Sequence, residues 1–196
     1  RQACLDIDAA LGGIFLVQGA VTVIVETVTQ LGAAGKGARA AVVAVLGVAD
    51  GIGGLPAGGQ ASQLAVVTLE KIFTGHAAGH KLNYPRILSE VNEQVFRLGR
   101  VLSPQFGIGS TLTFAHVTGV KLHIGHVGDS SALRLRANAL EQLTSDHTIE
   151  NELKERAARG EPIGLLMENR NALTRCIGQP PPLESECTEH TILPKD

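Results

Sequence analysis

The sequence predicts an α+β fold in which helices pack on antiparallel β-sheets. Three observations lead to this class. Strand-like apolar segments open the chain, segments with a helical apolar period follow, and further strand-like segments separated by turn residues come last. Because strands and helices do not alternate regularly, a parallel doubly wound sheet is disfavoured. With 196 residues, the chain is expected to form a single domain over 1–196.

Two segments near the start, 14–31 and 40–49, are predicted to be strands. Within the first segment, Val21, Val23 and Val25 stand at alternate positions, which indicates a half-buried strand. The second segment, AAVVAVLGVA, is apolar on both faces, which is typical of a strand in the centre of a sheet. The stretch between them that is rich in glycine and alanine, 32–37, is predicted to be a loop.

Two helices are predicted in the middle of the chain. From Ala61 to Phe73, apolar residues recur at i, i+3, i+4 and i+7, which places them on one face of a helix. Pro85 suits the first turn of a second helix, because proline has no amide hydrogen to lose there. The apolar face of this second helix is formed by Leu88, Val91, Val95, Leu98 and Leu102.

A second β-rich block follows. The turn residues Thr118-Gly119 lie between Ser110–Val117 and Lys121–Val127, which predicts a hairpin. Ala132–Leu135 and Leu140–Leu143 form another strand pair of the same kind. A polar helix is predicted at Thr148–Arg159, and the glycine after it is expected to cap its C-terminus.

Charge and composition exclude several classes of protein. A net charge of −2 without a Lys/Arg cluster argues against a nucleic-acid partner, since such proteins carry a basic surface. The longest apolar stretch, 9–25, falls short of the ~20 residues of a membrane span, so a membrane partner is not expected. An odd number of cysteines without CxxC spacing favours small buried thiols in a cytoplasmic protein. These cysteines are Cys4, Cys176 and Cys187.

Aspartates stand at the ends of two predicted strands. Asp50 follows a long run of apolar and glycine residues, and Asp129 follows the strand LHIGHV. Burial of an unpaired carboxylate costs several kcal/mol, so each is expected to meet hydrogen bonds or a cation. Glycines beside both aspartates allow a backbone carbonyl to approach, which suits a hard cation held by oxygen ligands. For Asp50 an Asx-type turn is the alternative.

A dinucleotide-binding turn is a second alternative for the glycines after Asp50. Gly51 and Gly53 follow a strand and precede a helix, as in the pyrophosphate fingerprint. However, Pro56 occupies the third glycine position, and Asp50 would point a negative charge at the phosphates. The fingerprint also requires an acidic residue about 20 positions later, at the end of a second strand, to bind the ribose. The acidic residue at that distance is Glu70, which lies inside a predicted helix.

Five segments, in order, resemble the metal-dependent PP2C-type (PPM) serine/threonine protein phosphatases. They are GVADGIGG (47–54), GSTLTFAHV (109–117), LHIGHVGDSSALRL (122–135), LTSDHT (143–148) and LTRCIG (173–178). The resemblance covers about residues 47–178. It implies a β-sandwich of two antiparallel sheets flanked by helix pairs, in agreement with the α+β prediction.

The resemblance also implies metal ligands. Asp50 corresponds to the aspartate that bridges two Mn²⁺ or Mg²⁺ ions, and Gly51 to the glycine whose carbonyl ligates one of them. Asp129 corresponds to the aspartate of the VGDS motif near the metal centre, where it could serve an additional ion. Ile52 stands where many members place a histidine that acts as a general acid.

At the N-terminus, Arg1 and Asp6 resemble the family's Arg-x-x-x-x-Asp. The resemblance implies that Arg1 binds the substrate phosphate and that Asp6 supports the metals. Asp8 is the competing alignment, because the family's aspartate often precedes a small residue and Ala9 follows here. Ahead of that aspartate the family usually has an asparagine and an acidic residue, and this chain has Cys4 and Leu5 there.

The implied activity is hydrolysis of phosphoserine and phosphothreonine in a phosphorylated protein partner by water activated between two metal ions. The cysteines take no part in it. The chain begins at Arg1 and ends at Asp196, where the family continues into further acidic ligands, so it is expected to be incomplete at both ends. If those ligands are truly missing, the alternative is a catalytically degenerate regulatory module that binds phosphoproteins.

Overall fold

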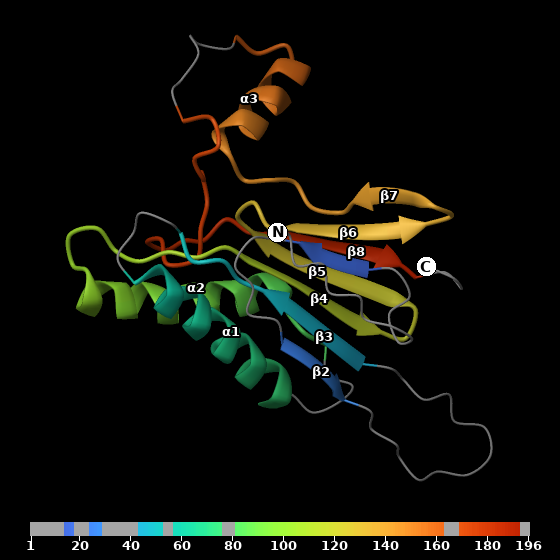
Figure 1. Cartoon of the computed structure of the whole chain (residues 1–196), viewed down its shortest axis with the longest axis horizontal. Coiled ribbons are helices and arrows are strands. Elements are labelled where there is room, and N and C mark those ends of the chain that lie inside the picture. The colour runs from blue at the N-terminus through green and yellow to red at the C-terminus, as the bar shows by residue number, and fades with distance from the viewer. Residues whose placement is uncertain are drawn as a thin grey trace.

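The computed structural model describes residues 14–17, 24–28, 43–52, 57–75, 81–162 and 169–192. Strands and helices follow one another as summarised in Figure 1. In chain order they are β1 (Ile14–Val17), β2 (Ile24–Val28), β3 (Val43–Val48), α1 (Gly58–Gly75), α2 (Tyr84–Leu102), β4 (Leu112–Thr118), β5 (Lys121–Val127), β6 (Ser131–Arg136), β7 (Ala139–Gln142), α3 (Ile149–Ala158) and β8 (Glu186–Thr191).

The strands form two antiparallel sheets. One has the order β1-β6-β7 and the other the order β2-β3-β4-β5-β8. Helices α1 and α2 cover the outer face of the five-stranded sheet, and the three-stranded sheet lies over its other face (Figure 1). The α+β prediction is therefore confirmed, and β3 lies inside its sheet as its apolar sequence indicated.

Two apolar layers hold these parts together. Along β4, Leu112 and Phe114 face the helices, whereas Ala115 and Val117 face the other sheet. A strand alternates its side chains between faces, so β4 is buried on both. Burial of one such Leu or Phe side chain contributes about 1.5–3 kcal/mol.

The segment 14–31 differs from the single strand that the sequence predicts. Its described parts are β1, which pairs with β6, and β2, which pairs with β3 in the other sheet. Alternation of apolar residues reports that a face is buried but not which strand lies alongside, so a change of sheet leaves no local signal. The predicted loop 32–37 lies outside the described residues.

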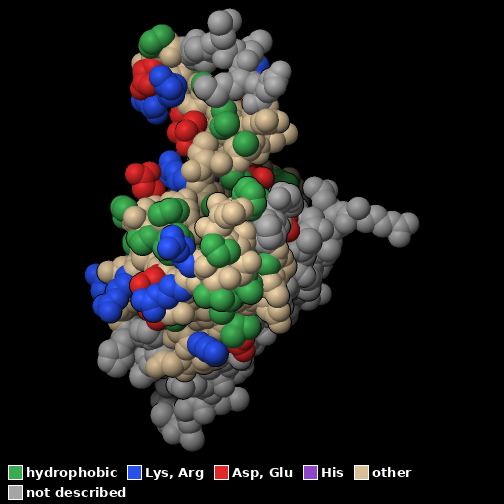
Figure 2. All heavy atoms as spheres, turned by 90° about the vertical axis from the view of Figure 1, so that its left-hand side faces the viewer, with side chains coloured by type: hydrophobic (Ala, Val, Ile, Leu, Met, Phe, Trp, Pro, Cys, Tyr) green, Lys and Arg blue, Asp and Glu red, His purple; other side chains and the backbone are tan. Residues whose placement is uncertain are grey.

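Both predicted helices in the middle of the chain are confirmed. The Asn83 side chain caps α2, and Pro85 lies in its first turn. Leu102 was predicted to lie on the buried face, but it is 45% exposed because it is the last residue of the helix. Figure 2 views the end of the molecule where α2 finishes and shows hydrophobic side chains at its surface. Val101, Leu102 and Phe106 are exposed there.

The second β-rich block also follows the prediction. β4 pairs with β5 through Thr118 opposite Lys121, and β6 pairs with β7. Ala137 and Asn138 both have positive φ, as the favoured two-residue hairpin turn requires. The sequence analysis did not predict β8. Its sequence ECTEHT is mostly polar because β8 is a partly exposed strand at the edge of its sheet.

Helix α3 is confirmed but contributes no buried side chain. Thr148 caps its N-terminus, and Gly160 follows it with a φ of +74°. Its surface carries interspersed acidic and basic side chains, which Figure 2 shows at the top of the molecule. None of the helices in the described part of the chain is both long and apolar enough to cross a membrane.

Candidate active site

The backbone around Asp50 is fixed by the segment that precedes β4. The Asp50 amide donates to Thr111 Oγ1 at 3.0 Å, and the Asp50 carbonyl accepts from the Thr111 amide at 2.9 Å and from Ser110 Oγ at 3.0 Å. The Ile52 amide donates to the Gly109 carbonyl. These bonds tie the backbone that follows β3 at Asp50 to the segment before β4.

Gly51 lies against the first turn of α1. A Cβ added there would come within 2.3 Å of the Gly58 carbonyl carbon and 2.4 Å of its oxygen, both backbone atoms. Only glycine therefore fits between β3 and this helix. The close approach places the first turn of α1 beside Asp50 and Gly51.

Asp129 is presented by the connection between β5 and β6. Gly128 has a φ of +115°, and a Cβ there would meet Thr111 Cγ2 at 2.6 Å, so this position also requires glycine. Ser130 Oγ lies 2.7 Å from Thr111 Oγ1, the same oxygen that accepts the Asp50 amide. One buried threonine thus joins the loops that carry Asp50 and Asp129.

The carboxylates interact electrostatically. Burial raises the pKa of Asp50, and the negative charge of Asp129 raises it further. Burial also raises the pKa of Asp146; the hydrogen bond from Gln142 opposes this shift, and the charge of Asp129 adds to it. Asp129 is therefore within electrostatic range of both other carboxyl groups. Such crowding of like charges is what a bound cation relieves.

The sequence analysis predicted two of these three aspartates. Asp50 and Asp129 come together as expected, with Gly51 beside them, whereas Asp146 was given no role although it lies in the quoted segment LTSDHT. The signal that could have found it is an acidic residue four positions after the end of β7. The predicted Arg1, Asp6 and Asp8 lie outside the described residues.

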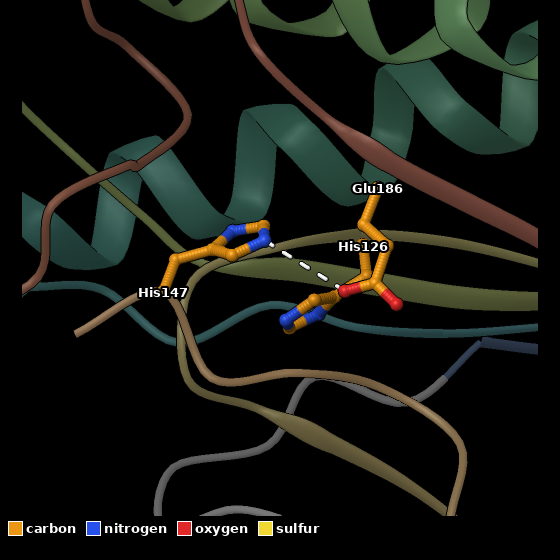
Figure 3. Close-up of side chains that lie close together, drawn as sticks. All are labelled: His126, His147 and Glu186. Atoms are coloured by element: carbon orange, nitrogen blue, oxygen red, sulfur yellow. Dashed lines mark ion pairs between the residues drawn. The ribbon is translucent and has the colours of Figure 1, made fainter. Parts of the chain in front are cut away.

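A histidine cluster lies beside the aspartates. His126, His147 and Glu186 have potential ligand atoms within 4.8 Å of one another, and Figure 3 shows the three side chains converging. Burial lowers the pKa of His126 to about 4 and that of His147 to about 3, so both imidazoles are neutral at neutral pH. Burial raises the pKa of Glu186. This cluster was not predicted, because its members lie far apart in the sequence.

The two described cysteines do not have the properties of catalytic nucleophiles. Cys176 and Cys187 are free and partly buried, where the sequence predicted small buried thiols, and Cys4 lies outside the described residues. Burial raises the pKa of both described thiols. A raised thiol pKa disfavours the thiolate, which is the nucleophilic form.

Known structures define the class to which this fold belongs. The chain superimposes on a serine/threonine phosphatase of S. agalactiae with a TM-score of 0.64 and 25% identity, over 89% of this chain and 75% of that one. It also matches PppA, a key regulatory component of T6SS in Pseudomonas aeruginosa, with a TM-score of 0.61 and 30% identity, over 76% and 61% of the two chains.

Sequence comparison agrees with the structural matches. The family model for protein phosphatase 2C matches residues 33–157. The serine/threonine phosphatase stp of Listeria welshimeri is 32% identical over 136 residues, which are 67% of this chain and 54% of that protein. The chain therefore belongs to the protein phosphatase 2C (PPM) family, which is metal-dependent. It spans about half the length of the Listeria relatives it matches.

Proposed function

We propose that this chain carries the site of a metal-dependent protein phosphatase that hydrolyses phosphoserine and phosphothreonine in proteins. The observation that carries the proposal is the proximity of two like-charged carboxylates, Asp50 and Asp129. Each raises the cost of the other's negative charge, and Thr111 joins the loops that carry them. Family membership and relatives described as serine/threonine phosphatases support the same activity. The substrate class, a phosphorylated protein, follows from those relatives.

The residues present fit a hard divalent cation. Asp50, Asp129 and Asp146 supply carboxylate oxygens, and the two influences that raise the pKa of Asp50 are its burial and a neighbouring negative charge. Oxygen donors with excess negative charge are the environment that Mn²⁺ and Mg²⁺ prefer. We assign Asp50, the Gly51 carbonyl and Asp129 to two or more such ions. Asp6, or Asp8 in the competing alignment, is assigned as a further acidic ligand.

When bound, the cations supply a nucleophile from water at neutral pH and positive charge for the phosphoryl oxygens. The protein's own contribution is to hold the ligands still. The Asp50 amide donates to Thr111 Oγ1, the Asp50 carbonyl accepts from Ser110 Oγ, and the first turn of α1 packs against Gly51. Arg1 is assigned to the substrate phosphate, which a guanidinium binds through two parallel hydrogen bonds. With Ile52 in place of a histidine, the leaving serine oxygen takes its proton from water.

The test is hydrolysis of p-nitrophenyl phosphate and of a phosphothreonine peptide, with Mn²⁺, with Mg²⁺ and with EDTA. We expect turnover that requires the metal and is lost in Asp50→Asn, since this change removes a charged ligand. Glu93→Gln is the matched control, because Glu93 lies on the exposed surface of α2 and pairs only with Arg97 among the described contacts. Binding of the phosphopeptide without turnover by the wild-type chain would instead establish a regulatory phosphoprotein-binding module.

A further inference from the structure

The histidine cluster beside the site resembles a transition-metal site in composition, but its hydrogen bonds assign it a different task. His147 Nδ1 accepts the Gly128 amide at 3.1 Å, and both groups are buried. A neutral imidazole has one lone pair in the ring plane, so this contact leaves the proton on Nε2. The nitrogen that faces Glu186 therefore has no lone pair to give to a metal.

Both ring nitrogens of His126 also have hydrogen-bond partners within the protein. Its Nε2 lies 3.1 Å from the Ser145 carbonyl oxygen, which can only accept, so Nε2 carries the proton. Its Nδ1 lies 2.7 Å from Thr113 Oγ1. Both imidazoles thus direct their lone pairs at protein groups, and neither directs one at Glu186.

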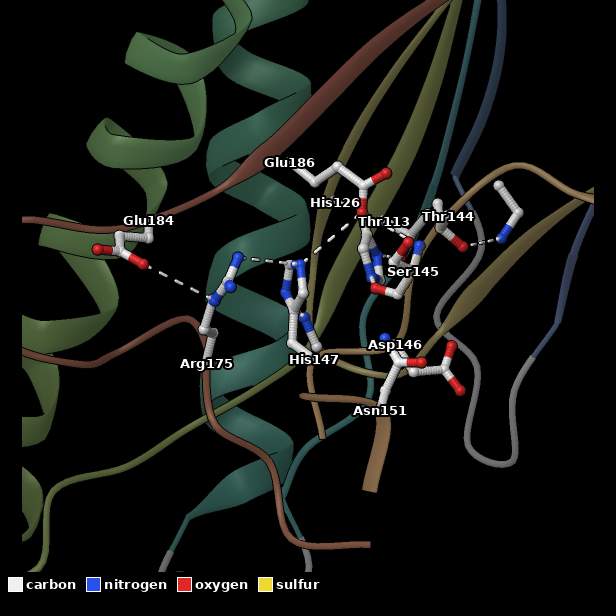
Figure 4. Close-up of polar contacts among 12 residues, drawn as sticks. Thr113, His126, Thr144, Ser145, Asp146, His147, Asn151, Arg175, Glu184 and Glu186 are labelled. Carbon is white, nitrogen blue, oxygen red and sulfur yellow. Dashed lines mark hydrogen bonds and ion pairs between the residues drawn. The ribbon is translucent and has the colours of Figure 1, made fainter. Parts of the chain in front are cut away.

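A positive charge already lies next to the cluster. Arg175 Nη1 is 3.4 Å from His147 Nε2, and Arg175 Nε is 3.9 Å from Glu184 Oε2 (Figure 4). A guanidinium in this place opposes the binding of a divalent cation. Two donors, the Gly128 amide and Arg175, compete for the single lone pair of His147. The amide is the closer, and it is buried, whereas the Arg175 side chain is 32% exposed.

His147 is joined to Gly128 by two hydrogen bonds in opposite directions. The His147 amide donates to the Gly128 carbonyl at 2.7 Å, and the Gly128 amide donates to the His147 ring at 3.1 Å. Gly128 directly precedes Asp129, and Asp146 directly precedes His147. A single residue therefore links the backbones that carry two of the three carboxylates.

We propose that His147 is a positioning residue that sets the separation of Asp129 and Asp146 by clamping Gly128, and that Glu186 orients its ring. This rests on the proposed function, in which Asp129 binds metal. Glu186 Oε2 accepts the Ser145 amide at 3.1 Å and lies 3.8 Å from His147 Nε2, so the carboxylate faces the protonated nitrogen. At this distance no hydrogen bond forms, and the negative charge favours through space the tautomer with the proton on Nε2, which leaves Nδ1 free to accept.

The first test compares two substitutions of His147. In His147→Asn the amide oxygen takes about the place of Nδ1 and still accepts the Gly128 amide. In His147→Gln the amide reaches the place of Nε2 and leaves the Gly128 amide without an acceptor. We expect His147→Gln to weaken Mn²⁺ affinity, measured by calorimetry, by about tenfold or more, and His147→Asn to recover most of it.

The outcomes separate this inference from the proposed function. Absence of Mn²⁺ binding by the wild-type chain would overturn the proposed function. Wild-type binding together with equal affinities in His147→Gln and His147→Asn would overturn the positioning role alone. Circular dichroism and thermal melts establish that both variants are folded before their affinities are compared.

A second measurement reads the tautomer of His147 directly and depends on no activity. Long-range ¹H–¹⁵N spectra of the metal-free wild-type chain at neutral pH report which ring nitrogen carries the proton. We expect Nε2–H for His147. Observation of Nδ1–H, with Nε2 accepting from Arg175, would overturn the clamp. So would a tetrahedral Co²⁺ spectrum that disappears in His126→Gln, since it would make the cluster a metal site.

Discussion

Thr111 Oγ1 and Ser130 Oγ lie 2.7 Å apart in the interior, and the same Thr111 oxygen accepts the amide of Asp50. The hydroxyl of Thr111 therefore connects the end of β3 with the β5–β6 connection. Ser130 follows Asp129 directly, so this connection determines how far apart the two assigned metal ligands lie.

Replacement of Thr111 tests that connection. Thr111→Val keeps the shape of the side chain but leaves the Asp50 amide and Ser130 without their shared partner, and we expect a loss of about 1–3 kcal/mol in the free energy of unfolding. Thr111→Ser retains the hydroxyl and serves as the control. Urea denaturation at neutral pH measures both, and a Thr111→Val protein as stable as Thr111→Ser would show that the hydroxyl does not hold the loops.

Gly51, before α1, and Gly59, in its first turn, allow a matched comparison of alanine substitutions. Gly51→Ala would place its Cβ on the Gly58 backbone and force α1 to move away. We therefore expect the free energy of unfolding to fall by about 1–3 kcal/mol. A Cβ on Gly59 meets nothing within 4 Å, so Gly59→Ala is expected to be neutral or to stabilise the chain by up to about 1 kcal/mol. Thermal melts of both variants would contradict this contrast if they shifted equally.

The metal-free chain should become more stable when the charge of Asp50 is removed. Its pKa is raised in the folded state, so ionisation is less favourable there than in the unfolded chain, and stability falls as the pH rises above the ordinary aspartate value of 3.8. Asp50→Asn should therefore raise the melting temperature in EDTA at pH 7. The gain should vanish below pH 3.8. A lower melting temperature for Asp50→Asn at pH 7 would contradict the charge crowding.

Acid should destabilise the chain through a buried histidine at the opposite end of β4. His116 Nδ1 lies 3.0 Å from the Tyr84 hydroxyl, and burial, followed by the charge of His123, lowers the pKa of His116 to about 4. The unfolded chain binds this proton near pH 6.5 and the folded chain only near pH 4, so stability is lost as the pH falls through this window. His116→Gln should make this dependence shallower without abolishing it, because His126 and His147 contribute in the same window, as measured by urea denaturation from pH 7 to pH 4. An unchanged slope would show that His116 is not responsible.

Patterns within short segments predicted most of the fold. The apolar period of α1 and α2, Pro85 in the first turn of α2 and the turn residues at Ala137-Asn138 all act between neighbours in the chain, so the sequence carries their signals directly. The resemblance of five segments to one family likewise indicated Asp50, Gly51 and Asp129, because each lies within a short motif of contiguous residues. The polar edge strand β8 was missed, because its pattern contains no buried face that alternation could reveal.

The sequence by itself determined the class of fold and the paired strands, since each depends on residue type and spacing along one segment. It also indicated Asp50 and Asp129, whose roles as metal ligands stay predictions. The tertiary structure alone decided that β1 and β2 join different sheets and that Thr111 bonds the Asp50 amide 61 residues away. It also decided that His147 clamps Gly128. These contacts depend on which distant segments the topology brings side by side, and a hydrogen bond between them leaves no periodic trace in either segment.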